Sequence, residues 1–204
     1  MRSRISVLVA TSAILLSACS GNSSTETAPD PAVSSVAPAA AGAAEAGRVG
    51  EAGSDCPMPI SVGLAEGYTA KAVVLSEDDE LAALARRGTL TMVCEIDAKP
   101  AGNIGYLRVY TGKGTDLKTT LTAFIGEKAL TPAFTELTIG GQPAIEAVYT
   151  EKSQLDDTIE PERAFVVKAG DGITAVSLES LDGDEHQAML PAYELAKSAL
   201  KLTA

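Results

Sequence analysis

Polar and apolar residues alternate along most of the chain after residue 68, and this period of two is typical of half-buried strands. Turn-forming residues separate seven such stretches. The seven stretches are residues 68–75, 89–96, 104–111, 134–139, 144–150, 163–169 and 173–180. Gly140-Gly141 and Gly170-Asp171-Gly172 join the last two pairs, and because glycine accepts positive φ angles, they predict two tight hairpins.

A helical period replaces this alternation at three places. Helices are expected over residues 77–87, from residue 115 or 116 to 125, and over residues 185–202. Ser76 can cap the first helix, and Thr115 or Asp116 can cap the second. Pro191 indicates that the third helix starts near Leu190, because proline is best tolerated in a first turn.

These elements predict one α+β domain over residues 55–204, in which an antiparallel sheet is packed with helices. Residues 20–54 contain little besides Ala, Gly, Ser, Thr, Pro and a few acids. Such a composition cannot offset the entropy of ordering, so this stretch is expected to be a disordered tether. Its r.m.s. reach is roughly 30 to 35 Å.

The first 19 residues have the layout of an export signal. Arg2 and Arg4 precede an apolar run, Ile5 to Leu16, that is too short to span a bilayer. The run ends in Leu16-Ser17-Ala18-Cys19, which resembles a bacterial lipobox. The resemblance implies that residues 1–19 are a lipoprotein signal peptide and that the thiol of Cys19 carries a diacylglyceryl group. The protein would then be anchored to the cell membrane on its extracytoplasmic face. The alternative is an ordinary secretory signal in which Cys19 is incidental.

The net charge of the chain limits the kinds of molecule that it can bind. The formal net charge of −11 becomes −13 without Arg2 and Arg4, because 14 basic residues then face 27 acidic ones. A nucleic-acid partner is not expected, since a phosphate backbone is bound through clustered Lys and Arg.

The other two cysteines, Cys56 and Cys94, are left as a pair in an oxidising compartment, and a disulfide between them is expected. Closing a loop of about 39 residues stabilises a domain by about 4 kcal/mol in the chain-entropy model. The alternative is two free buried thiols.

No motif for catalysis, a metal or a cofactor stands out. His186 is the only histidine, and the sequence has no nucleophile motif to go with it, so a solvated histidine at a helix start is the better interpretation. One histidine cannot complete a zinc site, and the acidic clusters lack the spacing of a calcium loop. The segment from Gly112 to Thr115 lacks the first glycine of a phosphate loop. No metal and no cofactor are predicted.

Tyr106, Arg108 and Tyr110 form the most suggestive set, because alternating strand positions place two rings and a guanidinium on one sheet face. Such a stripe can stack on a sugar, a peptide or a lipid-linked ligand. The alternative, favoured here, is that a helix covers this face, the tyrosines belong to the core and Arg108 pairs with a carboxylate such as Glu146.

Four blocks of residues 57–202 carry a family resemblance. They are Cys94 to Asp97, Asn103 to Tyr110, Ile139 to Ala144 and the closing helix. Together they resemble small actinomycete lipoproteins of the LpqN type, which implies a PsbP-like fold, an antiparallel sheet between helices. The resemblance brings no functional motif.

The sequence therefore favours a lipid-anchored, non-enzymatic domain that binds a peptide, a protein or an envelope component. One alternative is an immunity-type lipoprotein that sequesters an antimicrobial peptide, because an acidic surface suits a cationic ligand. Another is a cell-wall-acting enzyme with Glu95 and Asp97 as paired carboxylates. A purely structural role is the third.

Overall fold

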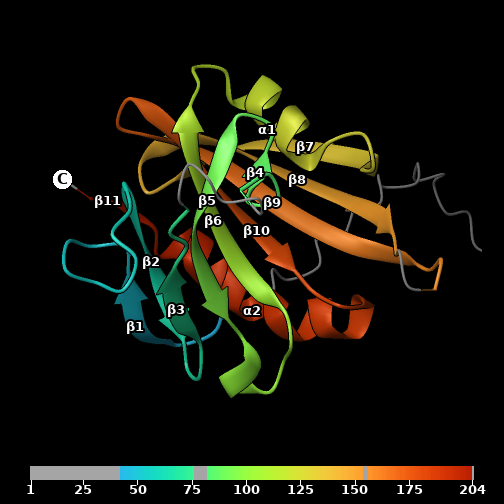
Figure 1. The fold of residues 1–204 in the computed structure, drawn as a ribbon, viewed down its shortest axis with the longest axis horizontal. Helices are drawn as coiled ribbons and strands as arrows, with labels where there is room; N and C mark the ends of the chain where they lie inside the picture. Colours follow the sequence, from blue (N-terminus) through green and yellow to red (C-terminus); the bar gives the residue numbers. More distant parts are fainter. Residues whose placement is uncertain (1–41, 76–81, 154–155, 204) are drawn as a thin grey trace, which may run out of the picture. The chain divides into compact units, whose positions relative to one another are not determined.

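A computed structural model describes residues 42–75, 82–153 and 156–203. One antiparallel sheet dominates it, with strand order β3-β5-β6-β10-β9-β8-β7 and β4 beside β5 (Figure 1). Its strands are β3 (Thr69–Ala72), β4 (Arg86–Arg87), β5 (Leu90–Asp97), β6 (Tyr106–Lys113), β7 (Leu130–Ile139), β8 (Gln142–Lys152), β9 (Ile159–Ala169) and β10 (Gly172–Glu179). A second, small sheet has the order β1-β2-β11, with β1 (Glu45–Val49), β2 (Ile60–Ala65) and β11 (Lys201–Leu202).

The two predicted hairpins are confirmed. Gly140 and Gly141 connect β7 to β8 with φ angles of 57° and 78°, and Gly170, at 56°, begins the turn from β9 to β10. These angles lie in the left-handed region that favours glycine. Strand β9 begins at Ile159, which pairs with Lys152 at the end of β8.

Two α-helices flank the large sheet. Helix α1 (Leu117–Ile125) has the predicted cap, because the Asp116 side chain accepts a hydrogen bond from the Thr119 amide at 2.6 Å. Helix α2 (Gly183–Ser198) begins well before the predicted start at Leu190. Its start is fixed by Asp182, which accepts from the Glu185 amide at 2.8 Å, and Pro191 lies inside the helix.

The C-terminal end of α2 also differs from the prediction. The helix stops at Ser198, and residues 201–202 form β11, which pairs antiparallel with β2. Met189, Tyr193, Ala196 and Leu200, which recur at helical spacing in the sequence, are all buried. Pairing with β2 satisfies backbone groups that a longer helix would have used, and the amphipathic pattern alone cannot distinguish these outcomes. Among the described residues, no helix is both long and apolar enough to cross a membrane.

The helix predicted over residues 77–87 is wrong in its described part. Residues 82–85 form turns, and Arg86–Arg87 are β4, which pairs with Leu90 and Thr91 of β5. The Met92 amide donates to the Ala85 carbonyl at 2.8 Å, so the sheet takes the hydrogen bonds that a helix would make internally. Residues 76–81 lie outside the described residues.

The end of the predicted tether is also corrected. Residues 45–49, placed in the tether, form β1 and pair with β2, and Val49 is 2% exposed. Gly50 follows with φ 115°, where an added Cβ would lie 2.0 Å from the Ile60 carbonyl oxygen. Only glycine fits this close approach, and the pairing of β1 with β2 is what orders the segment. Residues 1–41, including Cys19, lie outside the described residues.

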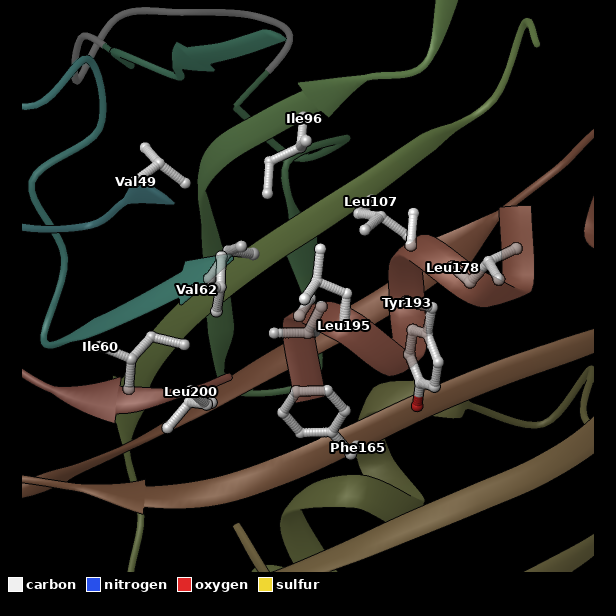
Figure 2. Packing of buried hydrophobic residues seen from close by; sticks show 14 of the residues in the cluster. Val49, Ile60, Val62, Ile96, Leu107, Phe165, Leu178, Tyr193, Leu195 and Leu200 are labelled. Carbon is white, nitrogen blue, oxygen red and sulfur yellow. The ribbon is translucent and has the colours of Figure 1, made fainter. Parts of the chain in front are cut away.

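Hydrophobic cores lie on both faces of the large sheet. On one face, β5, β6, β9 and β10 pack against α2 and the small sheet (Figure 2). Residues such as Ile60, Leu107, Phe165 and Tyr193 meet there and are almost fully buried. On the other face, α1 packs on Leu90, Tyr110, Val166 and Ile173 among others. The architecture is the predicted α+β sandwich in a single domain.

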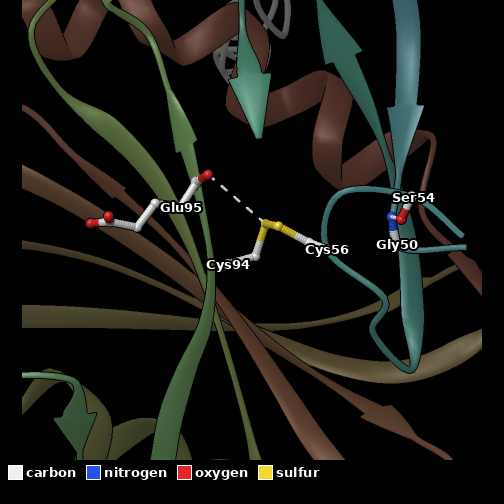
Figure 3. Close-up of a disulfide and its surroundings, with 5 residues drawn as sticks. All are labelled: Gly50, Ser54, Cys56, Cys94 and Glu95. Atoms are coloured by element: carbon white, nitrogen blue, oxygen red, sulfur yellow. Dashed lines mark hydrogen bonds between the residues drawn. A yellow bond between two sulfur atoms is a disulfide. The ribbon is translucent and has the colours of Figure 1, made fainter. Parts of the chain in front are cut away.

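The disulfide is present as predicted. Cys56 and Cys94 are joined with their Cα atoms 5.8 Å apart, which links the segment before β2 to β5 (Figure 3). Cys94 points toward the α2 side of the large sheet, and the next residue, Glu95, points the other way. The linkage thus holds the small sheet to one face of the strand whose opposite face carries the candidate site.

Candidate functional site

Charged side chains gather on the α1 side of the large sheet, beyond the part that α1 covers. They come from five strands and from β4. We call this region the polar sheet face, and its residues are Arg87, Glu95, Arg108, Glu151, Glu162 and Glu179. Side chains two positions apart on a strand point to the same face of the sheet. Glu179 therefore lies on the same face as Ala175, and Glu162 on the same face as Ala164, and both alanines belong to the core on the α1 side.

Arg108 connects three strands of this face. Its Nε donates to Glu95 Oε1 at 2.8 Å, its Nη1 pairs with Glu179 Oε2, and its guanidinium lies 4.9 Å from the centre of the Tyr106 ring. Glu95 is directly opposite Arg108 in the sheet pairing, and Glu179 is two positions along β10 from Ser177, the residue opposite Arg108. Such charge-assisted bonds fix the guanidinium in one orientation.

The suggested pairing of Arg108 with Glu146 is wrong. Glu146 lies on the other face of the sheet, where its Oε1 accepts from the Tyr193 hydroxyl and from Lys197 Nζ, both at 2.9 Å. The period of two places each residue on a face but does not tell which strands are neighbours. The order β5-β6-β10 is what brings Glu95 and Glu179 to Arg108.

The two tyrosines of the predicted stripe have different surroundings. Tyr110 is 1% exposed, packs edge to face on Phe124 of α1 with ring centres 4.9 Å apart, and donates its hydroxyl hydrogen to Glu179 Oε1. Tyr106 is half-buried and its hydroxyl accepts from Lys99 Nζ at 2.9 Å. Tyr110 is therefore a core residue, whereas Tyr106 and Arg108 remain accessible at the site.

Glu179 is the central residue that sequence reasoning missed. Besides Arg108 and Tyr110, it accepts from the Ser177 hydroxyl at 2.8 Å and pairs with Arg87 Nη2 at 3.0 Å. A glutamate at the end of a strand carries no motif. Only the topology, which places the end of β10 between β6 and β9, could have pointed to it.

The β8–β9 side of the polar sheet face has an excess of negative charge. Glu151 lies opposite Glu160, and Tyr149 lies opposite Glu162. Burial, followed by the charges of Glu151 and Glu179, raises the pKa of Glu162 to about 8. Burial also raises the pKa of Glu151. A carboxyl with such a pKa is in a place where a further negative charge is unfavourable.

Two shallow hollows border the polar sheet face. One, of about 380 Å³, is lined by Val73, Leu84, Ala85, Met92, Glu95 and Arg108. The other, of about 230 Å³, is lined by Glu151, Lys152, Ser153, Glu160, Glu162, Ser180 and Leu181. The first is mostly apolar with a charged rim, and the second is mostly acidic.

The remaining candidates have structural roles. His186 is 1% exposed, so its interpretation as a solvated histidine is wrong, and burial together with the charge of Arg163 lowers its pKa to about 4. Asp97 accepts from the Lys99 amide at 2.9 Å, while Asp182 and Glu185 hold the start of α2. Within residues 42–75, 82–153 and 156–203, no three His, Cys, Asp or Glu side chains converge to hold a metal ion.

Comparison with solved structures defines the fold class. Cyanobacterial PsbP (CyanoP) from Synechocystis is similar over 80% of this chain and 96% of its own, at 13% identity and a TM-score of 0.50. LpqN of Mycobacterium tuberculosis, which is involved in cell envelope biogenesis, is similar over 78% of this chain and 90% of its own, at 14% identity and a TM-score of 0.47. The similarity to CyanoP confirms the expected PsbP-like fold.

Comparison of the sequence with models of protein families identifies the family. The model of a family described as uncharacterised lipoprotein matches residues 25–200, and the chain belongs to that family. A search of curated protein sequences finds no match. The expectation of a lipoprotein with a PsbP-like fold is therefore confirmed by the family model and by the similarity to CyanoP.

Proposed function

We propose that this protein is a lipid-anchored lipoprotein on the extracytoplasmic face of the cell membrane, and that its domain binds a partner through the polar sheet face. Membership of a lipoprotein family and the sequence Leu16-Ser17-Ala18-Cys19 support the anchor. Two acyl chains, at about 0.8 kcal/mol per buried CH₂, would make attachment effectively permanent.

The observation that carries the binding role is the arrangement around Arg108. Its guanidinium is held by Glu95 and Glu179 beside the half-buried Tyr106 ring, at the rim of a hollow of about 380 Å³. A rigid aromatic and charged surface next to an apolar hollow is typical of a binding site, since its side chains lose little entropy when a ligand arrives.

An enzymatic role in the cell wall is supported less well by the same residues. The carboxylate of Glu95 is bound by Arg108, and that of Asp97 accepts from the Lys99 amide. Paired carboxylates that act on a glycoside need one member with a raised pKa and both free to reach the substrate. We expect E95Q and D97N to leave any activity on cell-wall material unchanged, and a loss on either substitution would favour the enzyme instead.

Two measurements test the proposal. Mass spectrometry of the membrane-derived protein should find a mature N-terminus at Cys19 with a diacylglyceryl mass, which the C19A variant should lack. An unmodified N-terminus, or one at another residue, would contradict the anchor.

The binding role is tested by pull-down from solubilised membranes with the lipidated protein. Tyr106→Ala should lose the retained partner, while Glu136→Gln, an exposed substitution on β7, should keep it. Equal retention by all three proteins, or no retained partner, would contradict binding through this face.

A further inference from the structure

We propose that the free edge of strand β7 binds an extended peptide segment with basic side chains at alternate positions, and that this segment adds a strand to the large sheet. The β7 edge is a second surface, separate from the polar sheet face, so the inference goes beyond the proposed function. In this mode of recognition, backbone hydrogen bonds hold the peptide and pockets for alternate side chains select it.

Strand β7 is the outermost strand on one side of the large sheet (Figure 1). Within the described residues it pairs with β8 alone, and the register shows which backbone groups are left free. Ile139 and Gln142 close the two-residue turn as a hydrogen-bonded pair, and from there hydrogen-bonded and non-hydrogen-bonded pairs alternate. The N–H and C=O groups of Phe134, Glu136 and Thr138 therefore point away from β8.

The positions of two prolines agree with this register. Pro143 of β8, which has no N–H, lies opposite Thr138, where the strand pairing needs no donor. Pro132 lies where the pairing shifts between Leu130 and Ala133, and a proline at an irregularity is a common way to blunt a sheet edge. The regular free edge thus begins at Ala133 and continues to the hairpin turn.

A hollow of about 350 Å³ borders this edge on the α1 side of the sheet. It is lined by Thr115, Asp116, Leu117, Lys118, Glu136, Leu137, Pro143, Ala144 and Ile145. Glu136 points to the α1 side, because Phe134, two positions away on β7, packs against the core there. Every second side chain of an added strand would point to the same side, toward the hollow.

The charges at this edge favour a basic partner. Glu136 is exposed and forms no ion pair with any described residue, since Lys118 instead lies over the Phe134 ring with its Nζ 2.7 Å from the ring centre. Asp116 lines the same hollow. A second copy of the chain fits less well, because it would place two Glu136 side chains opposite or diagonal to each other, and the chain has a formal net charge of −11.

The test is a titration of the full mature protein into the fluorescein-labelled peptide Thr-Val-Lys-Val-Lys-Val-Thr, followed by fluorescence anisotropy at pH 7.5. We expect saturable binding that weakens about tenfold or more in Thr138→Pro, which removes an outward N–H and no bond to β8. Thr138→Ala is the matched control and should bind like the wild-type protein, because it keeps the amide. Thermal unfolding by circular dichroism checks that both variants are folded.

Modified peptides test the same contact without changing the protein. One alternate set of peptide amides faces β7 in an added strand and the other faces away, so N-methylation of one set should abolish binding and N-methylation of the other should not. Glutamate in place of both lysines should weaken binding. Absence of saturable binding, equal binding of the two N-methylated peptides, or equal binding of the glutamate peptide would overturn the inference.

Two further measurements separate this edge from other surfaces. Tyr106→Ala should bind the lysine peptide like the wild-type protein, and a loss there would place the peptide on the polar sheet face instead. Analytical ultracentrifugation should find no dimer that Thr138→Pro dissociates. Such a dimer would mean that a second copy occupies the β7 edge, and it would overturn the inference while leaving the proposed function in place.

Discussion

Arg87 of β4 pairs with Glu179 at the end of β10, with Nη2 and Oε1 3.0 Å apart, although two strands lie between them. The same guanidinium lies over the rings of Tyr110 and Phe124, at 5.7 and 5.4 Å from their centres. Arg87 therefore joins the short β4 segment to helix α1 and to the centre of the sheet. It also supplies part of the positive charge that balances Glu179.

Replacing Arg87 by alanine should lower the free energy of unfolding by about 1 to 2 kcal/mol, because Glu179 loses a charged partner and two rings lose a stacked cation. Thermal or urea unfolding measures the effect. Arg86→Ala is the matched control, since Arg86 is the exposed neighbour on the same strand. Equal destabilisation by both substitutions would show that β4 as a whole, not the Arg87 pairing, is responsible.

Arg108→Ala should lower thermal stability, because it leaves Glu95 and Glu179 without their shared cation. A loss of about 1 to 3 kcal/mol is expected for removing one partner of a half-buried pair. Lys113→Ala, at the exposed end of the same strand, should have little effect. If Arg108→Ala abolished partner binding with stability unchanged, the arginine would be a ligand contact and not a structural residue.

Glu162 should make the protein less stable as the pH rises. The pKa of its carboxyl is about 8 in the folded state and near 4.5 when unfolded, so the folded state binds more protons between these values. Its contribution is complete below about pH 4.5 and is lost as the pH rises through 8. We expect the free energy of unfolding to fall by less in Glu162→Gln than in the wild-type protein between pH 5 and pH 9.

Comparing the two proteins at each pH cancels the contributions of other titrating groups to the free energy of unfolding. The most important is His186, whose pKa of about 4 gives the opposite slope, with stability rising between about pH 4 and 6.5. Parallel pH profiles for the wild-type protein and Glu162→Gln would contradict the raised pKa of Glu162.

Reduction of the disulfide should lower the free energy of unfolding by about 4 kcal/mol in the chain-entropy model, since Cys56 and Cys94 are 38 residues apart. Urea unfolding with and without reductant measures this difference, and the double variant C56A/C94A should resemble the reduced protein. A midpoint that does not change with reductant would mean that the small sheet holds to β5 without the covalent link.

The fold could be predicted where short-range signals decide it. Gly140-Gly141 fixes a hairpin and Asp116 caps a helix, and neither depends on distant residues. Elements β1, β4 and β11 could not be predicted, because each is a short strand whose partner is supplied by tertiary structure. Val49 is the only large aliphatic residue of β1 and gives no period.

The candidate site was predicted in part for a related reason. Periodicity placed Tyr106, Arg108 and Tyr110 on one face, and this is correct. It did not identify Glu179 or Glu162, because these come from strands distant in sequence that the order β6-β10-β9-β8 brings together. Sequence patterns describe a strand's two faces, whereas a site on a sheet depends on which strands are adjacent.

The position of β1 decides how an anchored molecule would be oriented. The first described strand belongs to the small sheet, whose buried side chains pack with α2 against the large sheet, whereas Arg108 and Glu162 lie on the α1 side. Strand β1 thus lies behind the large sheet as seen from Arg108 and Glu162. A partner that approaches the polar sheet face would not have to pass the strand through which the N-terminal segment enters the domain.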